Sequence, residues 1–412
     1  MPRLSVALSL LLLAAGAVAG DGWHILLPEH RLAPAALGVV VNDDDPLSVR
    51  IADYYLRARG IPRRNLVHVR FRPASKLSPD VFRRVRAEAL RQAHPGIQAW
   101  ALTWALPYRV SCMSITSAFS FGFDRGWCSA SQCAPTRRSP LFNADTPRPF
   151  SDLGVRPAMA IAATDFASAR RLIDRGIAAD GSDPDGTAWL VSTPDRARNV
   201  RAAGYAQVAR QFRGWLKVGV VEADAIRDRD DVLFYFTGRV QVPGLDTLRF
   251  LPGAIADHLT SAGGVLDGTA QMSSLRWLEA GATGSYGTVV EPCNLPGKFP
   301  NPGLVMEHYT HGRTLLESYW AGVQQPGEGL FIGEPLAAPF DGQRLEDDGQ
   351  RLILHTRVLR AGRYRLEYAD APPGPYRAWP RVLRVRYHQR ALVLPRLPGR
   401  YYRLRRLSPA SH

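Results

Sequence analysis

Two short stretches between residues 250 and 300 carry the residue types that could do chemistry. Asp257 and His258 are adjacent in the first, and Glu291, Cys293 and Asn294 follow a glycine-rich run in the second. A histidine near a cysteine can take the thiol proton and leave a nucleophilic thiolate. The pattern therefore allows a peptidase-like cysteine hydrolase with a rearranged dyad, in which Cys293 is the nucleophile, His258 the base and Asp257 the orienting partner.

The same region can also be interpreted as a binding site without catalysis. Cys293 would then be half of a disulfide, for example with Cys112, and His258 would be an ordinary capping residue. The polar residues of such a binding site would be Ser285, Tyr286, Glu291 and Asn294. No cofactor or metal is expected, because the chain has no Walker motif, no G-x-G-x-x-G after its first strand and no H-E-x-x-H.

The first 19 residues are typical of a signal peptide. Arg3 supplies a positive charge, an apolar run extends from Leu4 to Ala15, and Ala17-Val18-Ala19 is a small-x-small cleavage site. The alternative is a retained N-terminal anchor, but the run is shorter than the ~20 apolar residues that span a bilayer. The mature protein is therefore expected in the periplasm or outside the cell, with no membrane span after cleavage.

Export permits disulfides, and the chain has four cysteines, at positions 112, 128, 133 and 293. Four cysteines allow three pairings, and the sequence does not choose among them. Cys128 and Cys133 are close enough in sequence to form a disulfide that closes one loop.

Strands alternate with helices along most of the chain, which is typical of a parallel sheet covered by helices on both faces. Residues 107–150 interrupt the alternation and are interpreted as a long, cysteine-containing surface insertion within an α/β domain of residues 20–340. The expected fold is caspase-like or flavodoxin-like, with a mostly parallel sheet. Ligands of such sheets bind in the loops at the carboxyl ends of the strands. The predicted strands cover 37–41, 65–71, 99–106, 157–163, 187–192, 218–221 and 232–236, and the predicted helices cover 47–59, 79–93, 166–178 and 196–216.

After Phe340 the pattern changes to alternation of apolar and polar residues, which predicts a small antiparallel β-sandwich over residues 341–412. This segment holds 16 arginines against six acidic residues, and so carries ten of the fifteen net positive charges of the chain. Such a surface favours anionic polymers such as acidic polysaccharide or lipid headgroups. Nucleic acid is not expected as a partner of an exported protein. The alternative is an arginine-rich surface that is merely solvated.

Three longer phrases resemble an uncharacterised family of exported bacterial proteins. They are Ala256-Asp-His-Leu-Thr-Ser261, Gly284-Ser-Tyr-Gly-Thr-Val-Val-Glu-Pro-Cys-Asn294 and Gly329-Leu-Phe-Ile-Gly-Glu-Pro-Leu-Ala337. That family occurs in species that carry exosortase, the membrane enzyme proposed to sort proteins with a C-terminal PEP-type signal. The resemblance covers roughly residues 35–340, and it implies an envelope setting and an exopolysaccharide-producing lifestyle without a known activity.

A fainter resemblance is to the gingipain-type cysteine peptidases, which combine a caspase-like fold with a trailing immunoglobulin-like domain. Gly312-Arg-Thr-Leu-Leu-Glu-Ser-Tyr-Trp320 is similar to the segment that closes their catalytic domain. In those enzymes a His-Gly pair follows one strand and the catalytic cysteine the next. Here the first position reads Phe236-Thr-Gly-Arg239, and the second carries His258 without a cysteine.

The sequence thus predicts an exported, envelope-associated protein on a peptidase-like α/β scaffold. Its expected role is binding or scaffolding linked to exosortase or exopolysaccharide systems, with protein tails or anionic polysaccharide as partners. The cysteine hydrolase is the alternative.

Overall fold

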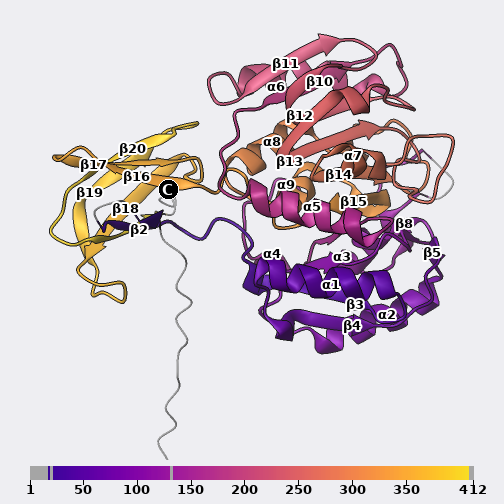
Figure 1. Cartoon of the computed structure of the whole chain (residues 1–412), viewed down its shortest axis with the longest axis horizontal. Coiled ribbons are helices and arrows are strands. Elements are labelled where there is room, and N and C mark those ends of the chain that lie inside the picture. Colours follow the sequence, from indigo (N-terminus) through magenta and orange to yellow (C-terminus); the bar gives the residue numbers. More distant parts are fainter. Residues whose placement is uncertain (1–16, 19–21, 130–132, 408–412) are drawn as a thin grey trace, which may run out of the picture. The chain divides into compact units, whose positions relative to one another are not determined.

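The computed structural model describes residues 17–18, 22–129 and 133–407, which divide into two compact units (Figure 1). The large unit comprises residues 30–342, and the small unit comprises the described residues before 30 and from 343 onward. Most of the predicted signal peptide lies outside the described residues; Ala17–Val18 form the short strand β1. None of the described helices has the length and apolar composition needed to cross a bilayer.

A sheet of ten strands is the centre of the large unit, in the order β11-β10-β12-β13-β14-β15-β9-β6-β3-β4. Strands β3, β4, β6 and β9 are parallel to one another, as are β10 to β14, whereas β15 is antiparallel to β14. The prediction of a mostly parallel sheet flanked by helices is confirmed. The strands are β3 (Leu37–Asn42), β4 (Leu66–Val69), β6 (Ala99–Leu102), β9 (Ala158–Ala160), β10 (Thr187–Ser192), β11 (Lys217–Glu222), β12 (Arg229–Gly238), β13 (Leu248–Leu259), β14 (Gly284–Thr288) and β15 (Gly329–Gly333).

Helices cover both faces of this sheet (Figure 1). The side chains of Asp257 and His258 on β13 show which helices lie on which face, because successive residues of a strand point to opposite sides. His258 contacts Trp277 of α7, whereas Asp257 pairs with Arg201 of η4. The helices are α1 (Pro46–Arg59), α2 (Pro79–Gln92), α3 (Ile115–Phe121), α4 (Pro149–Leu153), α5 (Phe166–Ala179), α6 (Tyr205–Gln211), α7 (Leu275–Ala280), α8 (Pro302–Thr310), α9 (Leu315–Gly322) and the 3-10 helices η1 (Pro34–Ala36), η2 (Arg63–Asn65), η3 (Arg125–Trp127), η4 (Asn199–Gly204), η5 (Leu245–Thr247), η6 (Pro296–Lys298) and η7 (Pro326–Glu328).

Local sequence signals set several helix ends. Helix α1 begins where the Asp45 side chain accepts a hydrogen bond from the backbone N–H of Leu47, and it ends at Gly60, whose φ of 61° is left-handed. Helix α9 begins with a capping box, in which Thr314 and Glu317 each bond the other's backbone N–H. These caps satisfy backbone groups that a helix end otherwise leaves unpaired.

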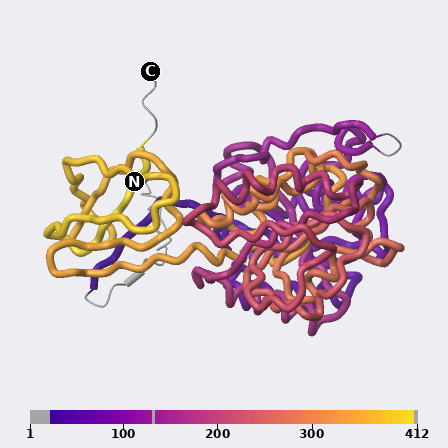
Figure 2. Tube along the Cα trace, turned by 90° about the horizontal axis from the view of Figure 1, so that it is seen from above, coloured from indigo at the N-terminus to yellow at the C-terminus, as the bar shows by residue number. Residues whose placement is uncertain are grey.

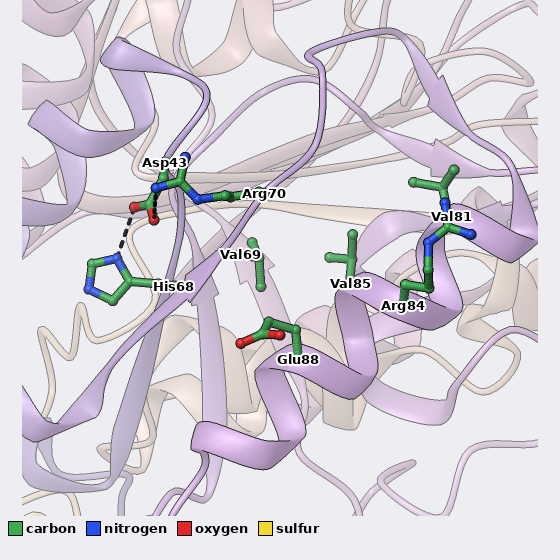
Figure 3. Close-up of a pocket in the computed structure, with 8 residues that line it drawn as sticks. All are labelled: Asp43, His68, Val69, Arg70, Val81, Arg84, Val85 and Glu88. Atoms are coloured by element: carbon green, nitrogen blue, oxygen red, sulfur yellow. Dashed lines mark hydrogen bonds and ion pairs between the residues drawn. The ribbon is translucent and has the colours of Figure 1, made fainter.

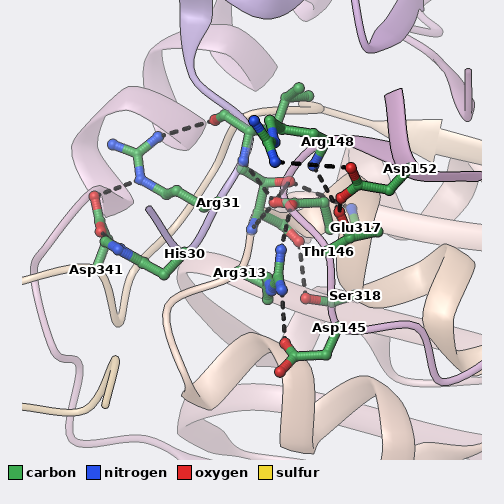
Figure 4. A network of polar contacts seen from close by, with 12 residues as sticks. His30, Arg31, Asp145, Thr146, Arg148, Asp152, Arg313, Glu317, Ser318 and Asp341 are labelled. Carbon is green, nitrogen blue, oxygen red and sulfur yellow. Dashed lines mark hydrogen bonds and ion pairs between the residues drawn. The ribbon is translucent and has the colours of Figure 1, made fainter. Parts of the chain in front are cut away.

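The capping residue Glu317 also anchors the start of the large unit (Figure 4). Its carboxylate accepts hydrogen bonds from the backbone N–H of Leu32, at 3.1 Å, and from Nη1 of Arg313, at 3.0 Å. Arg31 in turn donates from Nε to Asp341 at 2.5 Å. The first and last residues of the unit are therefore fixed by one polar network.

Residues 107–150 are the predicted surface insertion only in part, because residues 107–121 are largely buried whereas most described residues of 122–150 are exposed or half-buried. Part of the segment forms α3, which packs against β9 and β15 and is buried from Ile115 to Ser120. Two short strands of the segment, β7 (Arg109–Val110) and β8 (Met113–Ser114), form a three-stranded sheet with β5 (Lys76–Leu77). The apolar side chains of α3 explain its burial, because they add to the core beside the sheet.

Loops that follow β4 and β6 contact loops that follow β13 and β14 beside the large sheet. The Ser75 hydroxyl, beyond β4, donates to Asp267, beyond β13. Nη1 of Arg109, beyond β6, donates to the carbonyl oxygen of Val289, beyond β14, at 3.1 Å. The loops at the carboxyl ends of β13 and β14 take part in these contacts, and α/β sheets place their ligands in such loops.

The small unit consists of two sheets around one core of its own. The sheets have the orders β1-β2-β21-β18-β19 and β16-β17-β20, and buried side chains from both sheets form one cluster. This is the architecture of a β-sandwich. The strands are β2 (His24–Leu26), β16 (Gln343–Asp347), β17 (Arg351–Thr356), β18 (Gly362–Ala369), β19 (Arg377–Val385), β20 (Ala391–Pro395) and β21 (Tyr401–Arg406).

Two details of the small unit differ from the sequence interpretation. Strand β2, which the predicted boundaries assign to the large domain, pairs with β21 in the small unit (Figure 2). That pair is parallel, so the sandwich is not wholly antiparallel. The alternation of His24, Ile25 and Leu26 is too short to reveal its partner, which lies almost the full length of the chain away.

Candidate functional site

His258 is a structural residue in the core and not a catalytic base. It is 1% exposed, and its Nδ1 accepts a hydrogen bond from Nε1 of Trp277 at 2.9 Å. Because indole N–H only donates, the proton of the imidazole must be on Nε2, which donates to the carbonyl oxygen of Met272 at 3.0 Å. Burial lowers the pKa of His258 from 6.5 to about 3. Both ring nitrogens are engaged, so the imidazole has no site left for a substrate proton.

Asp257 does not orient His258. The two side chains point to opposite faces of β13, and Asp257 forms an ion pair with Arg201, whose Nη1 lies 2.6 Å from Oδ1. Burial raises the pKa of Asp257 to about 6, although the Arg201 guanidinium acts in the opposite direction. The predicted catalytic use of Asp257 and His258 is therefore wrong.

The cysteines pair in a way that also removes the predicted nucleophile. Cys112 is bonded to Cys128, and Cys133 is bonded to Cys293, so the predicted Cys128–Cys133 disulfide is wrong. The second bond joins residues 160 positions apart, a connection that sequence proximity cannot indicate. A sulfur held in a disulfide is not a thiolate. The Cys293/His258 dyad of the alternative hydrolase is therefore contradicted, because Cys293 is in a disulfide and both ring nitrogens of His258 are hydrogen-bonded in the core.

Two of the four predicted binding residues are also buried in the fold. Ser285 and Tyr286 belong to β14, of which every residue is buried. The Tyr286 hydroxyl donates to the backbone carbonyl of Lys298 at 2.5 Å, which supports the following loop. Neither side chain is available to a ligand.

The other two predicted residues, Glu291 and Asn294, line an open hollow of about 290 Å³ at the carboxyl edge of the sheet. We call it the Arg198 hollow. It lies beside the end of β13, as expected for a ligand site of an α/β sheet. Its lining residues are Cys133, Ala197, Arg198, Leu259, Thr260, Ser261, Glu291, Cys293, Asn294 and Phe299.

Arg198 is held in a fixed orientation at this hollow. Its Nη1 lies 3.1 Å from Oδ2 of Asp195, and its Nε donates to the hydroxyl of Thr260 at 3.1 Å. The Thr260 hydroxyl then donates to Gln271 at 2.7 Å. The side chain is 25% exposed, so part of the guanidinium reaches solvent. A guanidinium fixed in this way is prepared to bind a carboxylate with little loss of side-chain entropy.

The loop that forms the other wall, residues 291–300, is fastened at several points. Its Cys293 is tied to Cys133, and the Cys293 backbone N–H donates to the Glu291 carboxylate at 2.7 Å. Farther along, Arg201 donates from Nη1 to the carbonyl oxygen of Pro300 at 3.1 Å. The hollow is therefore preformed.

A buried ion pair lies under the same loop. Nζ of Lys298 is 2.9 Å from Oε2 of Glu328 and 2.9 Å from the Ser129 hydroxyl, and the Lys298 and Glu328 side chains are both fully buried. The sequence analysis did not single out this pair. Lys298 is one of three lysines in a chain whose other basic residues are all arginine, and this rarity was the available signal.

Another hollow lies between β4 and α2, and Figure 3 shows its lining. There Nδ1 of His68 lies 2.8 Å from Oδ1 of Asp43, an arrangement that can orient an imidazole. The remaining lining residues are Val69, Arg70, Val81, Arg84, Val85 and Glu88, and they include no serine, threonine or cysteine. The residues around this His–Asp pair therefore supply no nucleophile.

The fold and the site together define an α/β protein with a disulfide-braced hollow at the carboxyl edge of its sheet. No protein-family model matches the chain, and no curated protein matches it. A solved structure titled "Structure of Protease" aligns with 88% of this chain and 97% of its own, with a TM-score of 0.41 and 10% sequence identity. A TM-score of this size does not assign the chain to a fold family.

Proposed function

We propose that this chain is an exported binding protein of the cell envelope, which recognises an extended segment of another protein at the Arg198 hollow. The observation that carries the proposal is the fixed, partly exposed guanidinium of Arg198 beside a loop that a disulfide holds open. Preformed clefts with polar groups in fixed positions are typical of ligand sites.

The lining of the hollow suits a polar peptide better than a polyanion. Arg198 carries one positive charge, whereas Asp195, which pairs with it, and the lining residue Glu291 carry two negative charges, so the hollow has no positive excess that would attract a polyanion. A single ligand carboxylate can bind the free edge of Arg198, while the exposed Ala197 offers apolar contact. Asn294 and Ser261 can exchange hydrogen bonds with a peptide backbone.

The features of the site argue against a reaction at this hollow. Its lining contains no histidine, and its cysteines are joined to each other. What the hollow offers is positioning without an activated nucleophile, as a binding protein requires.

The envelope setting and the kind of partner are part of the proposal, and they are supported by the sequence. The phrases that resemble an exported family of exosortase-carrying species favour a role linked to exosortase or exopolysaccharide systems. A partner with a C-terminal PEP-type tail would present a glutamate between two prolines. The carboxylate of that glutamate suits the guanidinium of Arg198. A caspase-like, peptidase-derived scaffold belongs to the same proposal.

Calorimetric titration with a soluble peptide that contains Pro-Glu-Pro tests this function. We expect binding by the full chain, and weakening by about tenfold or more in Arg198→Ala, because a charge-assisted hydrogen bond is lost. The matched control is Arg196→Ala, which removes an exposed arginine two residues away that does not line the hollow.

A peptide with Pro-Gln-Pro should bind the wild type as weakly as Pro-Glu-Pro binds Arg198→Ala. Absence of binding by the wild type would refute the function, and equal weakening in Arg196→Ala would refute the site.

A further inference from the structure

The outer face of the larger sheet of the small unit has a concentration of arginines. Strands β2, β18, β19 and β21 together contain eight arginines and a single acidic residue, Glu367. Alternation decides which of them face outward, because Tyr364, Leu366, Tyr402 and Leu404 are buried in the core of the unit. The residues between them point to solvent. We define the arginine face as Arg363, Arg365, Arg384, Arg403 and Arg405.

The strand register places like charges directly opposite each other on this face. Arg363 pairs with Arg384 across β18 and β19, and Arg365 pairs with Arg405 across β18 and β21. Like charges directly opposite in a sheet destabilise it. The arginine pairs therefore do not stabilise the fold. A bound anion would offset the repulsion between the paired guanidinium groups.

Glu367 neutralises only one side of the face. Its carboxylate accepts from Nε of Arg403 at 2.7 Å and from Nε of Arg405 at 3.1 Å. Arg363, Arg365 and Arg384 are exposed, and none of them has an acidic partner within the described part of the chain. Three guanidinium groups on neighbouring strands thus remain for an external anion.

We propose that the arginine face binds an acidic polysaccharide. Guanidinium groups recognise carboxylates and sulfates through paired N–H donors, and a row of them suits a polymer with repeated charges. The face also carries a flat aromatic surface, since His24 and Tyr401 stack with ring centroids 4.7 Å apart. Among the strongly exposed large hydrophobic residues, Val382 alone belongs to these four strands, and a bilayer surface would need more apolar side chains to insert.

Affinity electrophoresis of the full chain through gels that contain polygalacturonate tests the proposal, with dextran as the uncharged control polymer. We expect polygalacturonate, but not dextran, to retard the protein. The retardation should decrease with added salt, because salt screens the interaction between the charges. The triple variant Arg363→Ala, Arg365→Ala, Arg384→Ala should bind polygalacturonate up to about tenfold more weakly than the wild type. The loss is limited because each exposed ion pair contributes little to affinity. This inference does not depend on the function proposed for the Arg198 hollow.

The matched control is Arg344→Ala, Arg351→Ala, Arg396→Ala, which removes the same charge from arginines that pair with acidic residues of the other sheet and its flanking loop. It should bind like the wild type. A triple lysine variant of the arginine face keeps the charge but loses the paired donors, so it should bind more weakly than the wild type and more tightly than the triple alanine variant. Equal loss in the control, equal retardation by dextran, or binding to phosphatidylglycerol vesicles without binding to polygalacturonate would overturn the proposal.

Discussion

The buried imidazole of His258 should make the large unit less stable as the pH falls. Replacing His258 with glutamine should remove this pH dependence. The pKa of His258 is about 3 in the folded protein, against 6.5 in the unfolded chain, because burial disfavours the charged ring. The unfolded state therefore takes up the proton first as the pH falls. Stability from this group is complete above pH 6.5 and is lost as the pH decreases toward 3.

The size of the effect follows from the two pKa values. Between about pH 7.5 and pH 5 the free energy of unfolding should fall by about 2 kcal/mol through His258. Asp257 acts in the opposite direction, because its pKa is raised to about 6. At each pH, the free energy of unfolding of His258→Gln is subtracted from that of the wild type. This difference cancels the contribution of Asp257, which both proteins contain.

Glutamine suits the site because its amide can donate to the carbonyl of Met272 and accept from Trp277 without titrating. Urea unfolding followed by tryptophan fluorescence measures the difference, since seven of the nine tryptophans lie in the large unit. His68→Gln, which removes an exposed imidazole, should leave the fall in stability intact. If the difference in unfolding free energy between wild type and His258→Gln does not change with pH, the conclusion that His258 is buried and neutral is refuted.

Three further outcomes are expected. Asp257→Asn should remove a pH dependence of the opposite sign, because the pKa of Asp257 is raised to about 6. In the same urea titrations, the unfolding free energy of the wild type should fall relative to that of the variant as the pH rises through 6. Serine at both Cys133 and Cys293 should lower the free energy of unfolding by about 2–5 kcal/mol, and should weaken peptide binding in calorimetry, because the loop of the hollow is released. Lys298→Met should destabilise by about 3–5 kcal/mol, because it leaves the Glu328 carboxylate buried without its cation, and adding Glu328→Gln should restore part of this loss in thermal unfolding.

Much of the fold could be predicted from local patterns. The continuous apolar run Leu37–Val41 predicts a strand covered on both faces, and β3 is buried at every position. The alternation around Arg363–Tyr368 predicts a strand with one face in a core, and β18 has this pattern. Such periodicities are properties of a few consecutive residues, so a single sequence displays them.

The candidate site could be predicted only in part. Glu291 and Asn294 follow a strand, where a general property of α/β sheets predicts a ligand site, and both line a hollow there; their role in binding stays a prediction. Ser285 and Tyr286 precede them by a few positions, but the strand continues through both, and its pairing with neighbours on each side buries them. Arg198 gave no signal, because the chain is rich in arginine throughout.

The sequence by itself determined the kinds of element and the basic excess of the C-terminal segment, and it predicted a ligand site at the carboxyl ends of the strands. Only the tertiary structure decided which groups meet: Cys133 with Cys293, Arg201 with Asp257, and β2 with β21. The physical reason is that these contacts join residues far apart in the chain. Their formation depends on how whole elements pack, and no local periodicity records that packing.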